Sequence, residues 1–255
     1  TWEEVIEAAA KLTKDLNGDG VTDIYGFNLP NDAPWDVNGL AFAAGARMVA
    51  EDGSVNVNVP EMIYILEGIQ RMCTEGSMPA NQHNACSDDF KNGTLAMMLS
   101  SCASNRGVAK GVQDKFEYAL CTFPSVNGTV AAPIGGNSLG IFKSTPDMEA
   151  IAWEFVKYMT SPEAQTGFTL DKGYLPITHS LMETEFVKDR LADTFWNQTF
   201  AQIEYLNGQP VHPADATIWN ELKDIMSIIE ADPNASVADL VAEMQSEVED
   251  FVLDY

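Results

Sequence analysis

Apolar residues recur every three or four positions along most of the chain, and short runs of β-forming residues separate these stretches. Such spacing places apolar side chains on one face of a helix. The opening segment 1–16 has this spacing, and Thr1 is followed three residues later by Glu4. This is the capping-box pattern, in which a hydroxyl and a carboxylate bind free amides at a helix start. The pattern therefore predicts that the chain begins with a helix.

The rest of the chain alternates between strands and helices at first and becomes mostly helical from Pro146 onward. Strands are predicted at 24–29, 95–99 and 118–123. Helices are predicted at 34–45, 60–75, 103–111, 147–160, 162–172, 186–206, 216–230 and 236–253. The alternation favours an α/β fold in which helices cover a partly parallel sheet.

Charge narrows the classes of function. The 255 residues include 14 Lys and Arg against 38 Asp and Glu, which gives a net charge of −24. A surface of this sign repels phosphate backbones, and nucleic-acid binding is therefore excluded. No run of 18 apolar residues is present, and the first residues do not form a signal peptide. We expect either a cytosolic protein or one whose leader has been removed.

The acidic residues are concentrated near the C-terminus. Segment 216–255 holds ten acids and a single base, Lys223. Acidic helical faces usually serve solubility, and we expect this one to be a solvated face. Binding of a basic partner is the alternative.

Four cysteines lack both the paired CxxC spacing and the nearby histidines of a zinc site: Cys73, Cys86, Cys102 and Cys121. Two disulfides or four buried thiols are the remaining alternatives. In an oxidising compartment the pairing of Cys73 with Cys86 closes the shortest loop, but the sequence does not choose among the three connectivities.

One segment has the spacing of a calcium loop. Side-chain oxygens occupy positions 1, 3, 5 and 9 of the loop, supplied by Asp15, Asn17, Asp19 and Asp23. Val21 stands at position 7, where the backbone carbonyl is the ligand. Gly20 stands at position 6, where the loop turns sharply, but position 12 is Gly26 instead of the bidentate glutamate. Asp and Asn also form ordinary turns between a helix and a strand. A structural calcium ion and a metal-free turn are therefore the two expectations.

Motifs of enzymes are missing from the sequence. His83, His179 and His212 lie in polar segments, which favours surface positions. The chain has no GxSxG or HExxH motif and no glycine-rich phosphate loop of the GxGxxG or GxxxxGK[ST] type. Asp88 and Asp89 are adjacent, so on a helix they point apart. The sequence predicts no catalytic site.

Aromatic residues are more informative. Trp35, Tyr174 and Trp219 lie beside proline or glycine or near predicted helix starts. Flat rings beside polar side chains suit the apolar face and the hydroxyls of a sugar. A core position is the alternative for Trp35 and Trp219, and we expect core positions for Trp153 and Trp196, which lie within periodic helical segments.

Six phrases in order carry a resemblance to a known family: TWEEVIEAAAKLTKDLNGDGVTDIYGF, FKNGTLAMMLSS, FPSVNG, PIGGNSLGIFKS, AIAWEFVKYMTSPEAQ and GYLPIT, followed by a late proline and a helix with tryptophan. The chain resembles the extracellular solute-binding proteins of ABC importers over essentially its whole length. The resemblance is greatest to the cluster of maltose-, oligosaccharide- and glycerol-3-phosphate-binding proteins. It implies an α/β, periplasmic-binding-protein-like (type II) fold with two lobes.

The resemblance also implies how the chain is divided between the lobes. Residues 1–133 and 210–255 correspond to the C-terminal lobe, 137–207 to the rest of the N-terminal lobe, and 134–136 and 208–209 to the hinge crossings. Family members carry a further stretch before the TWEE phrase. We therefore expect a truncated chain whose incomplete N-terminal lobe packs differently, swaps between chains or is poorly ordered.

Candidate ligand residues follow from the same resemblance. Trp35 and Trp219 correspond to rings that stack on sugar, and Tyr174 to a residue that faces the cleft. Hydroxyls at a strand-to-helix turn and a glycine phrase at the hinge complete the implied set: Ser100, Ser101, Ser104, Gly135, Gly136 and Asn137.

The implied function is capture of a carbohydrate by closure of two lobes, without catalysis, and delivery to the permease of an ABC transporter. Phosphate-binding relatives hold a late arginine where this chain has TIWNELKDI, and Arg106 is the nearby substitute. A neutral mono- or oligosaccharide is therefore favoured over glycerol-3-phosphate or another polyol phosphate. A glycan hydrolase and an acidic interaction module are alternatives of other classes. The implied location is extracellular or periplasmic, with a lipid anchor that this chain does not contain.

Overall fold

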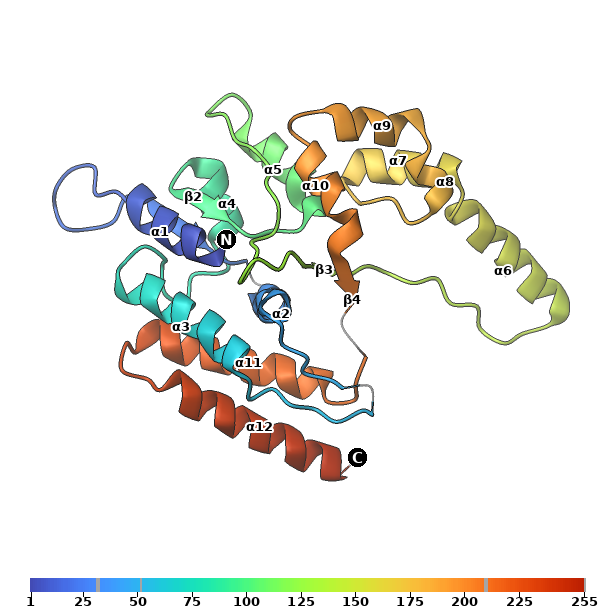
Figure 1. Ribbon diagram of the computed structural model, residues 1–255. Helices are drawn as coiled ribbons and strands as arrows, with labels where there is room; N and C mark the ends of the chain where they lie inside the picture. Colours follow the sequence, from blue (N-terminus) through green and yellow to red (C-terminus); the bar gives the residue numbers. More distant parts are fainter. Residues whose placement is uncertain (31–32, 51, 209–210, 255) are drawn as a thin grey trace. The chain divides into compact units, whose positions relative to one another are not determined.

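The protein consists of two compact units, each assembled from separate parts of the chain (Figure 1). The computed structural model describes residues 1–30, 33–50, 52–208 and 211–254. Unit 1 comprises Thr1–Ser100, Phe123–Pro133 and the chain from Tyr205 onward. Unit 2 comprises Ser101–Thr122 and Ile134–Glu204.

Unit 1 contains α1 (Trp2–Leu12), β1 (Tyr25–Asn28), α2 (Ala33–Ala44), α3 (Pro60–Thr74), α4 (Cys86–Asn92), β2 (Leu95–Met98), α11 (Asp215–Ala231) and α12 (Val237–Asp254). Strands β1 and β2 are parallel, with Tyr25 opposite Leu95 and Phe27 opposite Met97. A second pair is formed by β3 (Ala132–Ile134) and β4 (Leu206–Gly208). The α/β fold class and the parallel pairing are thus as the sequence predicts.

Helix α1 begins as predicted. The Thr1 hydroxyl accepts from the Glu4 amide at 3.2 Å, and the Glu4 carboxylate accepts from the terminal ammonium at 2.7 Å. The helix ends at Leu12, earlier than predicted, because Lys14 donates its amide to Ile24 in a short antiparallel bridge.

Helix α3 lies at the centre of unit 1, in contact with α1, α2, α11 and α12. Its apolar face is completely buried and consists of Met62, Ile65, Leu66, Ile69 and Met72. Pro60 at its start fits the first turn, where a helix has no use for an amide hydrogen. Helices α3, α11 and α12 lie side by side in Figure 1. The acidic C-terminal segment therefore contributes a buried face as well as the predicted solvated one.

Unit 2 consists mainly of short helices: η1 (Cys102–Ser104), α5 (Asn105–Val112), α6 (Pro146–Met159), α7 (Pro162–Lys172), α8 (His179–Met182), α9 (Glu185–Ala192), α10 (Asn197–Ala201) and η2 (Gln202–Tyr205). Its small core contains Leu181, Val187, Trp196 and Phe200. The core position predicted for Trp196 is confirmed. That predicted for Trp153 is wrong, because its side chain on α6 is 54% exposed.

Two predicted elements are also corrected. The strand at 118–123 is absent from the described structure, since Tyr118 donates to Asn105 at 2.9 Å and Leu120 packs on the small core. These side-chain contacts hold the segment without a partner strand. The single helix predicted at 186–206 is instead three shorter helical pieces interrupted after Ala192.

The division into units differs from the predicted lobes at two places. Residues 205–207, predicted with 137–204 in the N-terminal lobe, group with unit 1. Residues 101–122 group with unit 2, whereas the sequence places all of 1–133 in one lobe. The reason is that α5 contacts α7 and Leu120 joins the small core. The unit boundary between Pro133 and Ile134 lies next to the predicted crossing at 134–136. In the other predicted crossing, 208–209, residue 209 lies outside the described residues, and so does residue 210. The lobe assignment stays a prediction.

Candidate functional site

The two predicted sugar-stacking tryptophans both belong to unit 1. Trp35 lies near the start of α2 and Trp219 near the start of α11, and these helices contact each other. Both indoles are half-buried. They therefore keep part of their surface accessible, unlike Trp2, which is fully buried in the core of the same unit.

The predicted hydroxyl turn follows β2. Ser100, Ser101 and Ser104 are all exposed, and the unit boundary falls after Ser100. The Ser101 hydroxyl caps η1 by accepting from the Ala103 amide at 3.3 Å. Exposed hydroxyls of this kind can both donate to and accept from a ligand. Their role in binding stays a prediction.

The predicted glycine phrase and Tyr174 lie in unit 2. Gly136 and Asn137 are exposed, and a Cβ added at Gly136 would meet no atom within 4 Å. Tyr174 is half-buried and stacks on Phe168, with ring centroids 5.0 Å apart. Gly173 before it has φ +76°, and a Cβ there would lie 2.7 Å from the Cys102 carbonyl oxygen. Gly173 therefore allows the chain to pass close to Cys102 and sets the position of Tyr174.

The acidic loop after α1 is closed by its own carboxylates. Asp15 accepts from the amides of Gly18 at 2.7 Å and Gly20 at 2.8 Å, and these bonds lower the pKa of Asp15. Further turns are closed by hydrogen bonds from backbone amides to side-chain oxygens. The Asp19 amide donates to Asn17, the Val21 amide to Asp19 and the Leu16 amide to Asp23. Across the described residues no group of three or more Asp, Glu, His or Cys side chains gathers as a metal site. Calcium binding here stays a prediction.

A pair formed by a half-buried histidine and a buried glutamate was not foreseen from the sequence. The surface position predicted for His83 is wrong, since its ring lies between the Leu29 carbonyl at 2.9 Å and the Glu230 carboxylate at 2.9 Å. Glu230 is buried on α11 and also accepts from the Asn81 amide at 2.6 Å. Both ring nitrogens thus face acceptors, an arrangement that an imidazolium satisfies.

The charge state of His83 follows from two opposing effects. Burial of the ring disfavours its charged form, but the hydrogen bond and negative charge of Glu230 outweigh burial and raise the pKa of His83. The Leu29 carbonyl acts in the same direction. Burial and the negative charge of Glu230 also raise the pKa of the Cys73 thiol on α3. His83, in the segment between α3 and α4, thus links Leu29 after β1 to Glu230 on α11.

The four cysteines carry no disulfide in this structure. Cys73 and Cys86 belong to unit 1, whereas Cys102 and Cys121 belong to unit 2. Burial raises the pKa of Cys86 to about 12 and also raises that of Cys102. Cys121 is exposed, so the alternative of four buried thiols is wrong for this residue.

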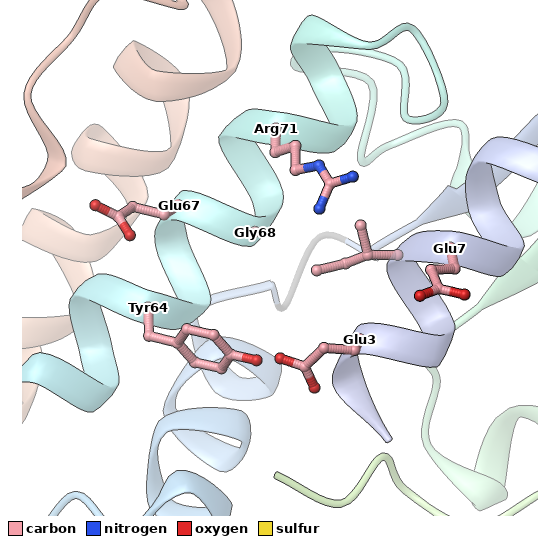
Figure 2. Close-up of a pocket in the computed structure, with 7 residues that line it drawn as sticks. Glu3, Glu7, Tyr64, Glu67, Gly68 and Arg71 are labelled. Carbon is pink, nitrogen blue, oxygen red and sulfur yellow. The ribbon is translucent and has the colours of Figure 1, made fainter. Parts of the chain in front are cut away.

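A cavity of about 260 Å³ lies between α1 and α3 in unit 1 (Figure 2). It is lined by Glu3, Ile6, Glu7, Tyr64, Glu67, Gly68 and Arg71. Figure 2 shows the Tyr64 hydroxyl pointing toward Glu3. Arg71 is paired with Glu75 at 2.8 Å, which leaves the walls predominantly acidic. None of the predicted ligand residues lines this cavity.

Comparison with known proteins identifies the family. The family model for bacterial extracellular solute-binding proteins matches residues 1–193. The chain belongs to this family. The resemblance seen in the sequence phrases is thereby confirmed, and no match was found among curated proteins.

Solved structures of similar fold include the following three proteins. The maltose/maltodextrin-binding domain MalE of Bdellovibrio bacteriovorus, bound to maltotriose, is 22% identical with a TM-score of 0.79, covering 98% of this chain and 66% of its own. UgpB of Mycobacterium tuberculosis, in complex with glycerophosphocholine, is 20% identical with a TM-score of 0.82, and the match covers 100% of this chain and 63% of UgpB. The sugar-binding protein MalE of Xanthomonas citri is 22% identical with a TM-score of 0.82, and the match covers 100% of this chain and 64% of that MalE.

These similarities confirm the periplasmic-binding-protein-like fold. The solute-binding protein spans about two thirds of the length of the solved structures that it matches. In the parts of the chain that the structure describes, no helix is both long and apolar enough to cross a membrane.

Proposed function

We propose that the protein is the substrate-binding component of an ABC transporter and captures a mono- or oligosaccharide for import, without catalysing a reaction. One observation carries the proposal. A chain of the solute-binding family presents two half-buried tryptophans, Trp35 and Trp219, on contacting helices of one unit. Partly accessible indoles offer the flat apolar surface against which a sugar ring packs.

Hydrogen bonds would come from the other predicted residues. Ser100, Ser101 and Ser104 present exposed hydroxyls, and Asn137 presents an exposed amide. Such groups match the hydroxyls of a neutral sugar. The location proposed is extracellular or periplasmic, with a lipid anchor in the full-length protein and a transporter permease as partner.

Two solved neighbours are MalE proteins, and a third binds glycerophosphocholine. The phosphate alternative requires a cation at the ligand. Asn220 and Glu221 follow Trp219 on α11, and the next base on that helix is Lys223. The acidic and neutral residues around Trp219 thus support a neutral ligand.

The proposal is tested by thermal unfolding of the protein translated from its complete reading frame. Maltose, maltotriose, other oligosaccharides, glycerol-3-phosphate and glycerophosphocholine are compared at equal concentration. A ligand present at 100 times its Kd stabilises by about 2.7 kcal/mol, so a bound sugar raises the Tm. A shift with the two phosphate compounds alone would support polyol-phosphate binding. Release of smaller sugars, followed by chromatography, would indicate a hydrolase, and no shift with any glycan would refute carbohydrate capture.

A further inference from the structure

Segment 81–83 connects two parts of unit 1 that are far apart in the sequence. The His83 ring lies 2.9 Å from the Leu29 carbonyl, which follows β1, and 2.9 Å from the Glu230 carboxylate on α11. The Asn81 amide donates to the second oxygen of Glu230 at 2.6 Å, and the Asn81 side chain donates to a carbonyl of the same helix at 3.2 Å. Segment 81–83 therefore fixes the chain after β1 to the end of α11.

The two elements that segment 81–83 joins lead to the candidate sugar-stacking residues. Leu29 lies shortly before α2, which carries Trp35 near its start. Glu230 lies near the end of α11, which carries Trp219 near its start. Helices α2 and α11 also contact each other. Packed side chains and rigid helices carry coupling between separate sites, so a contact that holds both elements also sets how the two rings are placed.

A second observation places the start of α2 near segment 81–83. The Cys86 amide donates to the His83 carbonyl at 3.3 Å. Burial and then the negative charge of Asp36 raise the pKa of Cys86 to about 12. Asp36 is buried on α2 and follows Trp35 directly. The first turn of α2, which presents the Trp35 ring, thus lies near the turn that His83 begins.

The contacts of His83 have two states that differ by one proton. An imidazolium donates from both ring nitrogens, so it satisfies the Leu29 carbonyl and the Glu230 carboxylate together. A neutral ring has a single N–H, and one of these two acceptors then faces a lone pair instead of a donor. A buried acceptor without a donor is unfavourable. Loss of the proton therefore weakens the link at Leu29 or at Glu230.

The surroundings of the ring favour the protonated state. The titratable groups around segment 81–83 come from four helices and are three carboxylic acids and one thiol: Glu230 on α11, Asp36 on α2, Asp89 on α4 and Cys73 on α3. Burial lowers the pKa of His83, but the hydrogen bond and charge of Glu230 and the Leu29 carbonyl together raise it by more. The ring therefore loses its proton above its ordinary value of about 6.5.

We propose that His83 is a positioning residue of the sugar-binding surface: its protonated ring holds α2 and α11 in the arrangement that binds sugar, and loss of the proton weakens binding. This rests on the proposed function, which assigns Trp35 and Trp219 to that surface. Sugar affinity accordingly falls as the pH rises above about 6.5. Because coupling is reciprocal, sugar binding in this pH range takes up a proton.

The indole N–H resonances of the two rings test the positioning without any ligand. Their chemical shifts are followed from pH 5.5 to 9 in the nitrogen-15-labelled protein translated from its complete reading frame. We expect the signals of Trp35 and Trp219 to titrate with a common midpoint above about pH 6.5. The signals of Trp153 and Trp196 in unit 2 should stay unchanged. Absence of a titration at both Trp35 and Trp219 would overturn the proposal, whatever the protein binds.

Substitutions identify the group that titrates. His83→Gln should abolish the midpoint in both indole signals, whereas His179→Gln, at an exposed position of unit 2, should leave it in place. Glu230→Gln keeps an acceptor oxygen but removes the negative charge, so the midpoint should move to lower pH. It also keeps the test open if His83→Gln does not fold. The same midpoint in wild type and Glu230→Gln would show that another group titrates and would overturn the proposal.

Calorimetric titration at pH 6 and pH 9 then measures the effect on affinity, with the sugar that raises the Tm of the protein most. We expect the wild type to bind about fivefold or more tightly at pH 6 than at pH 9, and His83→Gln to bind equally at both. Indole signals that titrate while the affinity is the same at both pH values would overturn the link from His83 to binding. Indole signals that titrate in a protein that binds no glycan would refute the proposed function and still support the positioning of the two rings by His83.

Discussion

His83 is held between two acceptors, the Leu29 carbonyl and the buried Glu230 carboxylate. Its pKa is raised in the folded protein, whereas an unfolded histidine titrates near its ordinary value of about 6.5. The pair therefore contributes its full stabilisation of the folded protein below about pH 6.5. This contribution is lost as the pH rises through the folded pKa of His83. Removal of His83 costs about 1–3 kcal/mol, since the Glu230 carboxylate is left buried.

We therefore expect the free energy of unfolding to fall as the pH rises from 6.5 toward the folded pKa of His83. Urea unfolding across pH 5.5–9 measures this slope. His83→Gln removes the titrating ring and should flatten the curve in that window, whereas His179→Gln, at an exposed position, serves as the control. The same slope in wild type and His83→Gln would contradict the role of the pair.

The loop after α1 gives a second prediction at the residue scale. Asp15→Ala removes the acceptor of the Gly18 and Gly20 amides, which we expect to lower the Tm. Asp114→Ala, an exposed aspartate in unit 2, is the control and should leave the Tm unchanged. Repeating both melts with calcium and with EDTA separates the alternatives. A calcium-dependent Tm that Asp15→Ala abolishes supports a bound ion, and the same Tm in both buffers supports a metal-free turn.

Elements of unit 1 approach closely where glycine removes a side chain. A Cβ at Gly26 on β1 would overlap the backbone of Ala9 on α1. A Cβ at Gly68 on α3 would lie 2.7 Å from the indole nitrogen of Trp2, which is buried without a hydrogen-bond partner. These two glycines allow α1 to pack against both β1 and α3.

Substitution of these glycines tests the packing. Gly68→Ala should destabilise by about 1–3 kcal/mol through overpacking, and Gly26→Ala by more because the clash is with backbone. Gly107→Ala on α5, where the added Cβ meets no atom within 4 Å, should stabilise by about 0.5–1 kcal/mol. Chemical denaturation of the three variants measures these changes. A Gly68→Ala variant as stable as wild type would mean that α1 and α3 pack less closely than described.

What the sequence could predict depended on the distance between interacting residues. The Thr1 and Glu4 cap is local and was predicted, as was the proline start of α3. The contact of His83 with Glu230 joins residues 147 apart, so no local pattern reveals it. The predicted strand at 118–123 failed for the same reason, because the ring of Tyr118 contacts that of Phe195 and Leu120 packs on the small core of unit 2. The roles of the candidate ligand residues stay predictions, which binding experiments test.

At the scale of the whole molecule, the family and fold were predictable because six phrases in a fixed order carry more information than any single motif. Those phrases did not predict that residues 101–122 belong to unit 2. Trp35 and Trp219 remain together in unit 1, on helices that contact each other. We therefore expect both indoles to belong to one sugar-binding surface.

The most direct test is calorimetric titration of the complete protein, its Trp35→Ala and Trp219→Ala variants, and Trp153→Ala as an exposed control, with the sugar that stabilises the wild type most. We predict saturable binding by the wild type and the control. Each of the other variants should bind at least tenfold more weakly, a loss of about 1.4 kcal/mol or more. Unchanged affinity in both Trp35→Ala and Trp219→Ala would contradict the account.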